Sequence, residues 1–462
     1  MEYLTPNKIA EITGGDYIGE ELARGVQVKG AVRDNRDVKP GNLFICIRGA
    51  RADGHDFANM AFASGAACCL AERVLQDAQG PYVLVNSTLE AIKTIGKYYR
   101  SLFDIPVIGI TGSVGKTTTK EMTAAVLGAK FRVLKTQENL NNELGVPLTL
   151  LSLDDRYEAA VIEMGISDFG EMGRLADMVR PDICIMTKIG YSHIETFGDL
   201  NGVLRAKSEV FAYIRPDGAA VVNGDDELLK VYDPGIHKIT FGLDAHNDFR
   251  ADNVHTEGTE TVKFDIVSGS GHFPVTIPAY GIHLVSAALA AAATGRQLGM
   301  TDEEIRRGLF SYKPTEGRSN VKDTGFITLI DDCYNANPNS VKAALTSLSS
   351  LQRRRVAILG DMLELGEQAE QLHREIGEIA ARSGISRLIC SGENAVFIYE
   401  GYISADGDDP WYFPDKTELI SAIPELIEKH DAVLVKASNG MKFKEIIPML
   451  ETLQDSALGD SM

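Results

Sequence analysis

The segment VIGITGSVGKTTTKEM, residues 107–122, contains residue types that bind phosphate. A common phosphate-binding loop follows the pattern G-x-x-x-x-G-K-[ST], and Gly115, Lys116 and Thr117 supply its second half. The first glycine of that pattern is missing, because Ile110 stands five residues before Gly115. Glycines allow tight curvature, and backbone amides at the start of the next helix point toward phosphates. We therefore expect Lys116 to contact the β- and γ-phosphates of a nucleotide and Thr117 to bind Mg²⁺.

Further chemical groups follow later apolar runs. Glu163 ends the run AAVIE, and His193 comes just after the run DICIMTKIG. Ligands of an open α/β sheet bind at the carboxyl ends of its strands, where a carboxylate can hold Mg²⁺ beside a phosphate loop. We expect Glu163 and His193 to be metal ligands; a surface strand-end glutamate and an exposed loop histidine are the alternatives. The pattern VLRAKSEVF predicts that Lys207 is a solvent-exposed helix lysine.

Two polar loops near the C-terminal end also follow predicted strands. The first, DDCYNANPNS at residues 331–340, offers carboxylates, amides and a phenol, although a plain turn would have a similar composition. The second, in LGDMLELG, places Asp361 at a strand end and His373 on the following helix. Both loops are candidates for ligand binding.

The composition limits the class of protein. A length of 462 residues predicts about three domains, and 44% hydrophobic with 24% charged residues is typical of a soluble globular protein. The net charge of −19 argues against nonspecific binding to nucleic acid or to anionic membranes, but not against small anionic ligands. The six cysteines are scattered, and Cys68 and Cys69 lie in an alanine-rich run that predicts core filling. With no apolar leader and no apolar run of about 18 residues, we expect a cytoplasmic protein.

The order of the expected elements predicts the fold class. Residues 1–98 mix short strands and helices: a buried strand in 41–49, an alanine-rich helix leading into a strand over 55–72, a strand at 82–87, and an amphipathic helix that begins at residue 88. From residue 105, alternating strands and helices predict a mostly parallel sheet, with antiparallel strands in 261–281 and an alanine-rich helix over 283–299. The alternation restarts near residue 317. We therefore expect domains at 1–98, 99–316 and 317–462, with a frayed tail at 456–462.

Taken together, these motifs resemble the Mur ligases of bacterial peptidoglycan synthesis. The first predicted domain contains DNRDVKPGNLFICIRGARADGHDF, the second contains TGSVGKTTTKE, NLNNELGVPLTLL, EMG, SHIETFG and AKSE, and the third contains DDCYNANP and LGDMLELG. The resemblance also accounts for Ile110, since the loop of this family is T-G-x-x-G-K-[ST] and residues 111–117 match it at each fixed position.

The resemblance implies a fold and an activity. The fold would consist of three α/β domains: a small nucleotide-sugar-binding domain, a central P-loop domain with a mostly parallel sheet, and a Rossmann-like C-terminal domain. DDCYNANP and LGDMLELG indicate the member that uses ATP and Mg²⁺ to add D-alanyl-D-alanine to UDP-N-acetylmuramoyl-tripeptide through an acyl phosphate. In such a reaction the protein mainly supplies positioning and charge neutralisation. The implied partners are these two small molecules, with no nucleic acid and no membrane insertion, and we expect a monomer.

The resemblance also assigns roles to individual residues. Lys207 aligns with a lysine that is carbamylated in relatives and binds a second Mg²⁺, which reverses the prediction of a solvent-exposed side chain. The implied catalytic residues are Lys116, Lys207, Arg318 and His193. The implied metal ligands are Thr117, Glu163, His193 and Lys207. The implied ATP-binding residues are Thr111, Gly112, Ser113, Val114, Gly115, Lys116, Thr117, Thr118, His283, Tyr334, Asn335 and Asn337. The implied substrate-binding residues are Asn35, Arg36, Asn139 and Asn142.

Two segments depart from the family pattern. The pattern G-x-H-N-x-x-N-A-L-A-A-A becomes GIHLVSAALAAAA, with Leu284 and Ser286 (or Ala287) where amides are expected near adenine. The pattern K-[GA]-S-R-x-M becomes KASNGM, in which Lys436 is kept and Asn439 replaces an arginine. These changes concern adenine binding and closure of the third domain.

Other functions remain as alternatives. A ligase of the same architecture with another acceptor is one, although DDCYNANP argues against it. A non-catalytic nucleotide-binding relative is another, although Lys116, Thr117, Glu163 and His193 argue against it. A switch GTPase is excluded because the chain lacks a base-reading motif of the N-K-x-D type.

Overall fold

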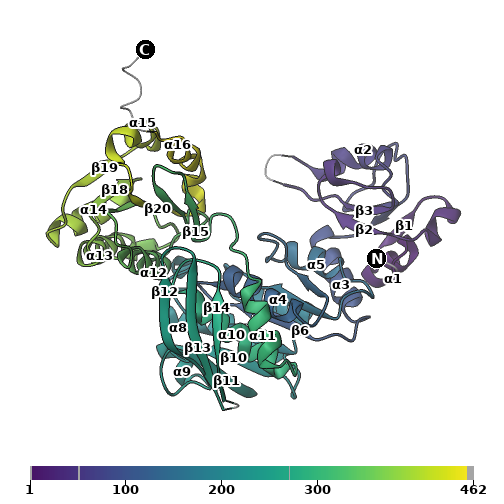
Figure 1. The fold of residues 1–462 in the computed structure, drawn as a ribbon. Coiled ribbons are helices and arrows are strands. Elements are labelled where there is room, and N and C mark those ends of the chain that lie inside the picture. The colour runs from purple at the N-terminus through teal and green to yellow at the C-terminus, as the bar shows by residue number, and fades with distance from the viewer. Residues whose placement is uncertain (1–2, 50–51, 270, 455–462) are drawn as a thin grey trace.

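The computed structural model describes residues 3–49, 52–269 and 271–454. Within these residues the chain forms three sheets, each with its own helices. Figure 1 shows three lobes, with the N-terminal lobe (purple) and the C-terminal lobe (green to yellow) both resting on a central lobe. The expected α/β class with mostly parallel sheets is confirmed. The tail at 456–462, which we expected to be frayed, lies outside the described residues.

The N-terminal lobe contains a five-stranded sheet in the order β1-β5-β4-β3-β2, parallel except for the β1–β5 pair. The expected alanine-rich helix is short: it ends at Ala63, and Cys68 already belongs to the next strand. Cys68 and Cys69 are fully buried, which confirms them as core residues. The strands are β1 (Asp16–Ile18), β2 (Gly30–Val32), β3 (Asn42–Ile45), β4 (Cys68–Ala71) and β5 (Tyr82–Leu84), and the helices are α1 (Pro6–Thr13), η1 (Glu21–Gly25), η2 (Asn35–Asp37), η3 (Gly54–Phe57), α2 (Ala58–Ala63) and α3 (Thr88–Arg100).

The central lobe contains a nine-stranded sheet in the order β14-β13-β12-β11-β10-β9-β6-β8-β7. The pairs from β7 to β12 are parallel, and β13 and β14 add an antiparallel edge, as the pattern in 261–281 predicted. β6 therefore lies between β8 and β9. The strands are β6 (Val107–Thr111), β7 (Val133–Lys135), β8 (Ala159–Glu163), β9 (Ile183–Met186), β10 (Ala219–Asn223), β11 (His237–Gly242), β12 (Phe249–Glu257), β13 (Thr261–Ser268) and β14 (Gly271–Ile277).

The helices of the central lobe cover both faces of this sheet. The predicted alanine-rich helix is α10, in which all residues from Ala287 to Gly295 are buried; the helix packs against α4 and against the strands β10 to β13. The helices are α4 (Lys116–Gly128), α5 (Gly145–Leu150), α6 (Glu171–Val179), α7 (Ile194–Phe197), α8 (Leu200–Ser208), η4 (Glu209–Tyr213), α9 (Glu227–Val231), α10 (Leu284–Gln297) and α11 (Asp302–Phe310). In the described residues no helix is both long enough and apolar enough to cross a lipid bilayer.

The C-terminal lobe contains a six-stranded sheet in the order β15-β16-β20-β17-β18-β19, parallel except for the β15–β16 pair. The strands are β15 (Asn320–Asp323), β16 (Thr328–Asp331), β17 (Arg355–Gly360), β18 (Arg387–Ser391), β19 (Pro410–Phe413) and β20 (Ala432–Lys436). The helices are α12 (Pro338–Ser349), η5 (Gly366–Gln368), α13 (Ala369–Arg382), α14 (Ala395–Ser404), α15 (Lys416–Leu426), η6 (Asn439–Met441), η7 (Phe443–Glu445) and α16 (Ile447–Glu451).

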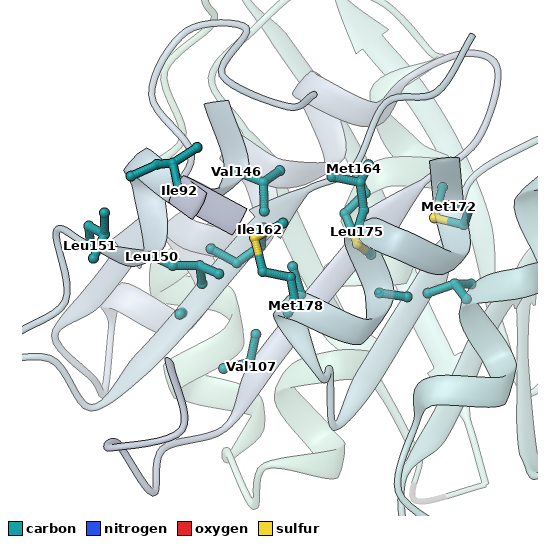
Figure 2. Packing of buried hydrophobic residues seen from close by; sticks show 14 of the residues in the cluster. Ile92, Val107, Val146, Leu150, Leu151, Ile162, Met164, Met172, Leu175 and Met178 are labelled. Atoms are coloured by element: carbon teal, nitrogen blue, oxygen red, sulfur yellow. The ribbon is translucent and has the colours of Figure 1, made fainter. Parts of the chain in front are cut away.

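Helix α3 joins the N-terminal lobe to the central lobe. The Ser87 side chain accepts a hydrogen bond from the backbone N–H of Glu90 and caps the helix start, while the apolar face of α3 enters one continuous cluster of buried side chains. Figure 2 shows Ile92 of α3 beside Val146 and Leu150 of α5 and near Ile162 of β8. The same cluster includes strand residues of the N-terminal lobe. The expected boundary between residues 98 and 99 falls inside this helix, so α3 belongs to both cores.

This shared core predicts the effect of truncating Ile92, which is fully buried. Ile92→Ala should lower the free energy of unfolding by about 2–5 kcal/mol, because the lost contacts leave a cavity in close-packed surroundings. Leu89→Ala is the matched control on the same helix, since Leu89 is 37% exposed; it should change the value by about 0.5 kcal/mol or less. Urea denaturation followed by circular dichroism measures both, and equal losses would contradict the role of Ile92.

Candidate active site

The phosphate loop connects β6 to α4 at the carboxyl edge of the central sheet. Gly112 and Gly115 have φ angles of +136° and +82°, a backbone region that favours glycine. A Cβ on Gly112 would lie 2.0 Å from the Thr187 hydroxyl. β6 has β8 on one side and β9 on the other, so the loop emerges between the ends of its two neighbours, where ligands of open α/β sheets bind.

The segment after β9 holds the loop in place. The Ser113 backbone N–H donates to the Lys188 carbonyl at 2.7 Å, and the Ser113 hydroxyl lies 3.0 Å from both the N–H and the carbonyl oxygen of Gly190. The Thr187 hydroxyl donates to the Val114 carbonyl at 2.6 Å. These contacts use the Ser113 amide together with side chains and a carbonyl of the loop, and they fix its shape before any phosphate binds.

A buried carboxylate lies beside the start of α4. The Thr117 hydroxyl donates to Glu163 at 3.0 Å, and the Asn141 amide donates to the same carboxylate at 2.8 Å. Glu163 is 1% exposed and Thr117 is 6% exposed. Asn141 was not predicted from the sequence, although it lies in NLNNELG, one of the segments that carried the family resemblance. The predicted pair Thr117–Glu163 is therefore brought together, with Asn141 as a third member.

The donors at this point suit Mg²⁺. Thr117, Glu163 and Asn141 present hard oxygen atoms, which Mg²⁺ prefers, and Thr117 and Asn141, which donate hydrogen bonds to the carboxylate, are neutral groups. In the part of the chain that the structure describes, no three His, Cys, Asp or Glu side chains form a metal-binding group. An all-protein cage is therefore not present, but Mg²⁺ commonly uses one or two protein ligands together with phosphates and water. The residues fit a Mg²⁺–nucleotide site.

Two lysines belong to this part of the lobe: Lys116 interacts with Glu163, and Lys207 interacts with Lys116. The Lys116 ammonium donates to the Gly112 carbonyl at 2.8 Å. Burial lowers the pKa of Lys116, Glu163 opposes this shift, and Arg318 adds to it. Burial also lowers the pKa of Lys207 well below its usual value, with a further contribution from Lys116. The structure thus places Lys116, Lys207 and Arg318 within electrostatic range of one site.

The prediction of a solvent-exposed Lys207 from its local pattern is wrong, because its side chain is 1% exposed. Val203, Ala206 and Lys207 lie on the same buried face of α8. A spacing of three and four residues is typical of the buried face of a helix. Because Lys207 is charged, its local pattern was interpreted as exposed instead. Among the described residues Lys207 takes part in no ion pair, although the Glu171 carboxylate lies within electrostatic range and opposes the lowering of its pKa.

His193 lies at the start of α7 with a φ angle of +57°. Its Nδ1 atom is 2.7 Å from the carboxylate of Glu364, a residue of the C-terminal lobe. Burial lowers the pKa of His193, Glu364 opposes this shift, and Lys207 and Lys116 add to it. His193 therefore lies within electrostatic range of the two lysines. Its partner Glu364 was not predicted from the sequence.

The junction between the central and C-terminal lobes gathers other predicted residues. The Arg318 guanidinium lies 4.0 Å from the ring centroid of Tyr334, and the Tyr334 backbone N–H donates to the Gly317 carbonyl at 3.1 Å. The His283 Nε2 atom is 3.3 Å from the hydroxyl of Ser319. These contacts join α10 of the central lobe to the segment that leads into β15.

The loop DDCYNANP has its own internal supports. The Asn337 side chain caps α12 by accepting from the Ser340 N–H at 2.9 Å, and its amide donates to Ser192 at 3.1 Å. The buried Lys436 ammonium pairs with Asp332 at 2.6 Å and donates to the Asn335 carbonyl at 2.9 Å. These residues thus support the shape of the loop, as expected for the alternative of a plain turn. Asn337 also contacts Ser192 of the central lobe.

Other polar candidates in the C-terminal lobe have structural partners. Asp361 accepts from the backbone N–H groups of Asn394 and Ala395 at 3.0 and 2.7 Å, at the start of α14. The His373 Nε2 atom accepts from the Met362 N–H at 2.9 Å. Both side chains accept hydrogen bonds from backbone N–H groups of their own lobe, which is a structural role.

The four predicted substrate-binding residues lie in two places, two in the N-terminal lobe and two on either side of Asn141. Asn35 and Arg36 are in η2 of the N-terminal lobe, where Arg36 pairs with Asp34. Asn139 and Asn142 follow β7, and the Asn142 side chain accepts from the Gly145 N–H at 2.8 Å at the start of α5. Their roles in substrate binding stay predictions. Thr118 lies on the first turn of α4, and the buried Thr111 hydroxyl lacks a hydrogen-bond partner within the described residues.

Three family models match the chain in succession. They are described as "Mur ligase family, catalytic domain" over residues 12–99, "Mur ligase middle domain" over residues 110–295, and "Mur ligase, glutamate ligase domain" over residues 317–439. Two full-length relatives carry the name UDP-N-acetylmuramoyl-tripeptide–D-alanyl-D-alanine ligase. The one from Bacillus subtilis is 36% identical over 96% of this chain and 97% of its own, and the one from Escherichia coli is 35% identical over 98% and 99%.

Solved structures give the same result. A crystal structure of MurF from Acinetobacter baumannii has a TM-score of 0.88 with 29% identity, covering 97% of this chain and 98% of its own. A MurF ligase from Thermotoga maritima, solved in complex with ADP, has a TM-score of 0.82 with 27% identity, covering 94% and 98%. The similarity therefore extends over the lobes and not over the phosphate loop alone.

The geometry of the loop predicts the effect of adding a side chain to Gly112. Gly112→Ala should weaken ATP binding roughly 5–150-fold, because left-handed strain of about 1–3 kcal/mol adds to a clash with Thr187. Gly128→Ala, at the end of α4, is the matched control, since a Cβ there meets nothing within 4 Å. Titration with a fluorescent ATP analogue measures both affinities. An unchanged affinity in Gly112→Ala would contradict the loop's assigned role.

Proposed function

Because this chain belongs to the Mur ligase family, we propose that its central site drives ATP-dependent addition of D-alanyl-D-alanine to UDP-N-acetylmuramoyl-tripeptide. The chain is a ligase that forms a C–N bond and acts on small molecules. One observation carries the proposal: the phosphate loop, the Thr117–Glu163 pair, the half-buried Lys116 and the buried Lys207 converge at the carboxyl edge of β6, β8 and β9.

The chemistry requires activation of a carboxylate, which is a poor electrophile because its charge repels an incoming amine. The terminal carboxylate of the tripeptide attacks the γ-phosphorus of ATP, the bond to the ADP oxygen breaks, and an acyl phosphate forms. The amine of D-alanyl-D-alanine then attacks the acyl carbon, loses a proton, and expels inorganic phosphate as the amide forms. Lys116 and the amides of residues 114–117 would neutralise charge on the transferred group and keep the reacting atoms aligned.

Thr117 and Glu163 would hold Mg²⁺, with Asn141 orienting the carboxylate. When bound, Mg²⁺ would offset the negative charge of the phosphate oxygens.

Lys207 is suited to covalent modification of its amine. A lowered pKa increases the neutral fraction of the amine. A neutral amine can add CO₂ and lose a proton to become a carbamate, which would supply the charge for a second metal ligand.

The C-terminal lobe would complete the site from the opposite side. Arg318 and Tyr334 lie stacked at the junction, and Lys116 is within electrostatic range of Arg318. We assign Tyr334, Asn335 and Asn337 to contacts with ATP or the incoming dipeptide, and His283 to the nucleotide side of the junction. Asn337 supports this assignment because it already contacts Ser192, whose hydroxyl donates to the phosphate-loop carbonyl of Ser113 at 2.9 Å.

The remaining assignments concern the whole chain. Asn35 and Arg36 would bind the uridine nucleotide-sugar, and Asn139 and Asn142 the peptide portion of that substrate. We propose domain boundaries near residues 98/99 and 316/317. The first family match ends at residue 99, the second covers residues 110–295, and the third begins at residue 317. We propose that the protein is a monomer.

The first alternative function, a ligase with another acceptor, is distinguished by testing a panel of amines in place of D-alanyl-D-alanine.

The deciding measurement is phosphate release. Release should require ATP, UDP-N-acetylmuramoyl-tripeptide and D-alanyl-D-alanine together, and its absence with all three would refute the function. Lys116→Ala should lower turnover by about a hundred-fold or more, because one positioned charge at the transferred group is lost. Lys342→Ala, a change at an exposed lysine on α12, is the control and should retain turnover. Turnover of Lys116→Ala equal to wild type would refute the role of Lys116.

Lys207→Ala tests the carbamate separately. Turnover should fall by about a hundred-fold or more, and millimolar formate or acetate should restore part of it, because a small carboxylate can occupy the space that the carbamate would fill. Lys207→Arg keeps a cation but cannot form this carbamate, so it should be inactive and not rescued. Arg205→Ala on the exposed side of α8 is the control. Full activity in Lys207→Arg would exclude an essential carbamate.

A further inference from the structure

The loop of residues 361–368 in the C-terminal lobe docks on α7 of the central lobe. Ile194 of α7 is 2% exposed and belongs to one buried cluster with Met362 and Leu365 of that loop. A Cβ placed on Gly366 would lie 3.3 Å from the Cβ of Glu195, so the backbones approach closely. This surface includes LELG, the part of LGDMLELG to which the proposed function gives no task.

Glu364 lies at the centre of this contact. Its carboxylate is 2.7 Å from Nδ1 of His193. Both residues have left-handed backbones, with φ angles of +63° and +57°. Such conformations cost of order 1–3 kcal/mol each and persist where surrounding contacts enforce them. The two strained residues meet each other across the interface between lobes.

The chemistry of the contact fixes the imidazole. A carboxylate on Nδ1 favours the tautomer that carries its proton on that atom and leaves the Nε2 lone pair available. Metal-binding histidines commonly donate their second ring N–H to a carboxylate or carbonyl, which sets the ring orientation. His193 lies within electrostatic range of Lys116 and Lys207, so the ring also belongs to the phosphate side of the central lobe.

We propose that Glu364 is a positioning residue: it orients His193 so that Nε2 faces the metal–nucleotide site, and it thereby makes metal binding depend on docking of the C-terminal lobe. This inference rests on the proposed function and on the expectation, drawn from the sequence, that His193 is a metal ligand. It gives the LELG segment a specific task, since Leu365 anchors the loop in the shared cluster while Glu364 reaches the imidazole.

The alternative role for Glu364 is competition: a carboxylate that holds the imidazole away from the metal would weaken metal binding. The two cases differ in sign. A positioning carboxylate makes metal binding weaker when it is removed, whereas a competing carboxylate makes it stronger. The sign of the change in metal affinity therefore decides between them.

The experiment compares full-length wild type, Glu364→Ala, Glu364→Gln and Glu367→Ala. Glu367 is an exposed carboxylate on the same loop and serves as the matched control. Mn²⁺ affinity is measured by electron paramagnetic resonance in the presence of a non-hydrolysable ATP analogue. Glu364→Ala should weaken Mn²⁺ binding about 10–100-fold, the range known for partners of metal-binding histidines. Glu364→Gln should weaken it less, because the amide oxygen still accepts from Nδ1, and Glu367→Ala should match wild type.

A second readout separates positioning from general damage. In protein labelled with ¹⁵N-histidine, the His193 resonances (assigned with a His193→Gln variant) should indicate the Nδ1–H tautomer in wild type, and Glu364→Ala should shift them toward a mixture. Unchanged or stronger Mn²⁺ binding in Glu364→Ala, or an unchanged tautomer, would overturn the inference. Wild-type phosphate release with both substrates is measured alongside: its absence refutes the proposed function, whereas its presence with unchanged Mn²⁺ affinity refutes only the role of Glu364.

Discussion

The contact between the Thr117 hydroxyl and the buried Glu163 carboxylate is the interaction on which the site depends. A carboxylate taken out of water is costly unless it is hydrogen-bonded and its charge is balanced. Thr117 and Asn141 supply the hydrogen bonds, and Lys116 together with a bound cation would supply the charge. The sheet register makes this possible, because β8 pairs with β6 so that Glu163 lies opposite Ile110. The residue that breaks the common loop pattern is thus the one that aligns the carboxylate with the loop.

The sequence predicted this edge of the sheet well, and it predicted contacts between distant segments poorly. Strand ends follow from apolar runs, so Glu163 and the loop were placed correctly. Asn141 was missed because it meets Glu163 across 22 residues of sequence, through the return of the chain from β7. Glu364 was missed because its partner lies in another lobe. Lys207 was misjudged from its own pattern because a charged residue on a buried helix stripe contradicts the usual rule that lysines face water.

The segment after β9 links the phosphate loop to the C-terminal lobe. Ser192 donates to the loop carbonyl of Ser113 and accepts from Asn337, while the next residue, His193, pairs with Glu364. The two motifs that indicated D-alanyl-D-alanine addition, DDCYNANP and LGDMLELG, therefore contact neighbouring residues of one segment. The C-terminal lobe thus contacts the same segment that holds the phosphate loop in place.

The departures from the family pattern lie at the opposite end of the nucleotide site. Leu284 is 3% exposed and packs in the central core, so it contributes to folding rather than to polar recognition. Asn439 lacks the charge of an arginine, and the nearby Lys436 is neutralised by Asp332. His283 is engaged by Ser319 at the junction. Because the family's amides and arginine are replaced here, we expect electrostatic recognition of ATP to depend on the phosphate loop, Lys116 and a cation held by Thr117 and Glu163. Selection for the base would then depend on shape and on neutral hydrogen bonds, for which the junction between the central and C-terminal lobes offers His283, Tyr334 and Asn335.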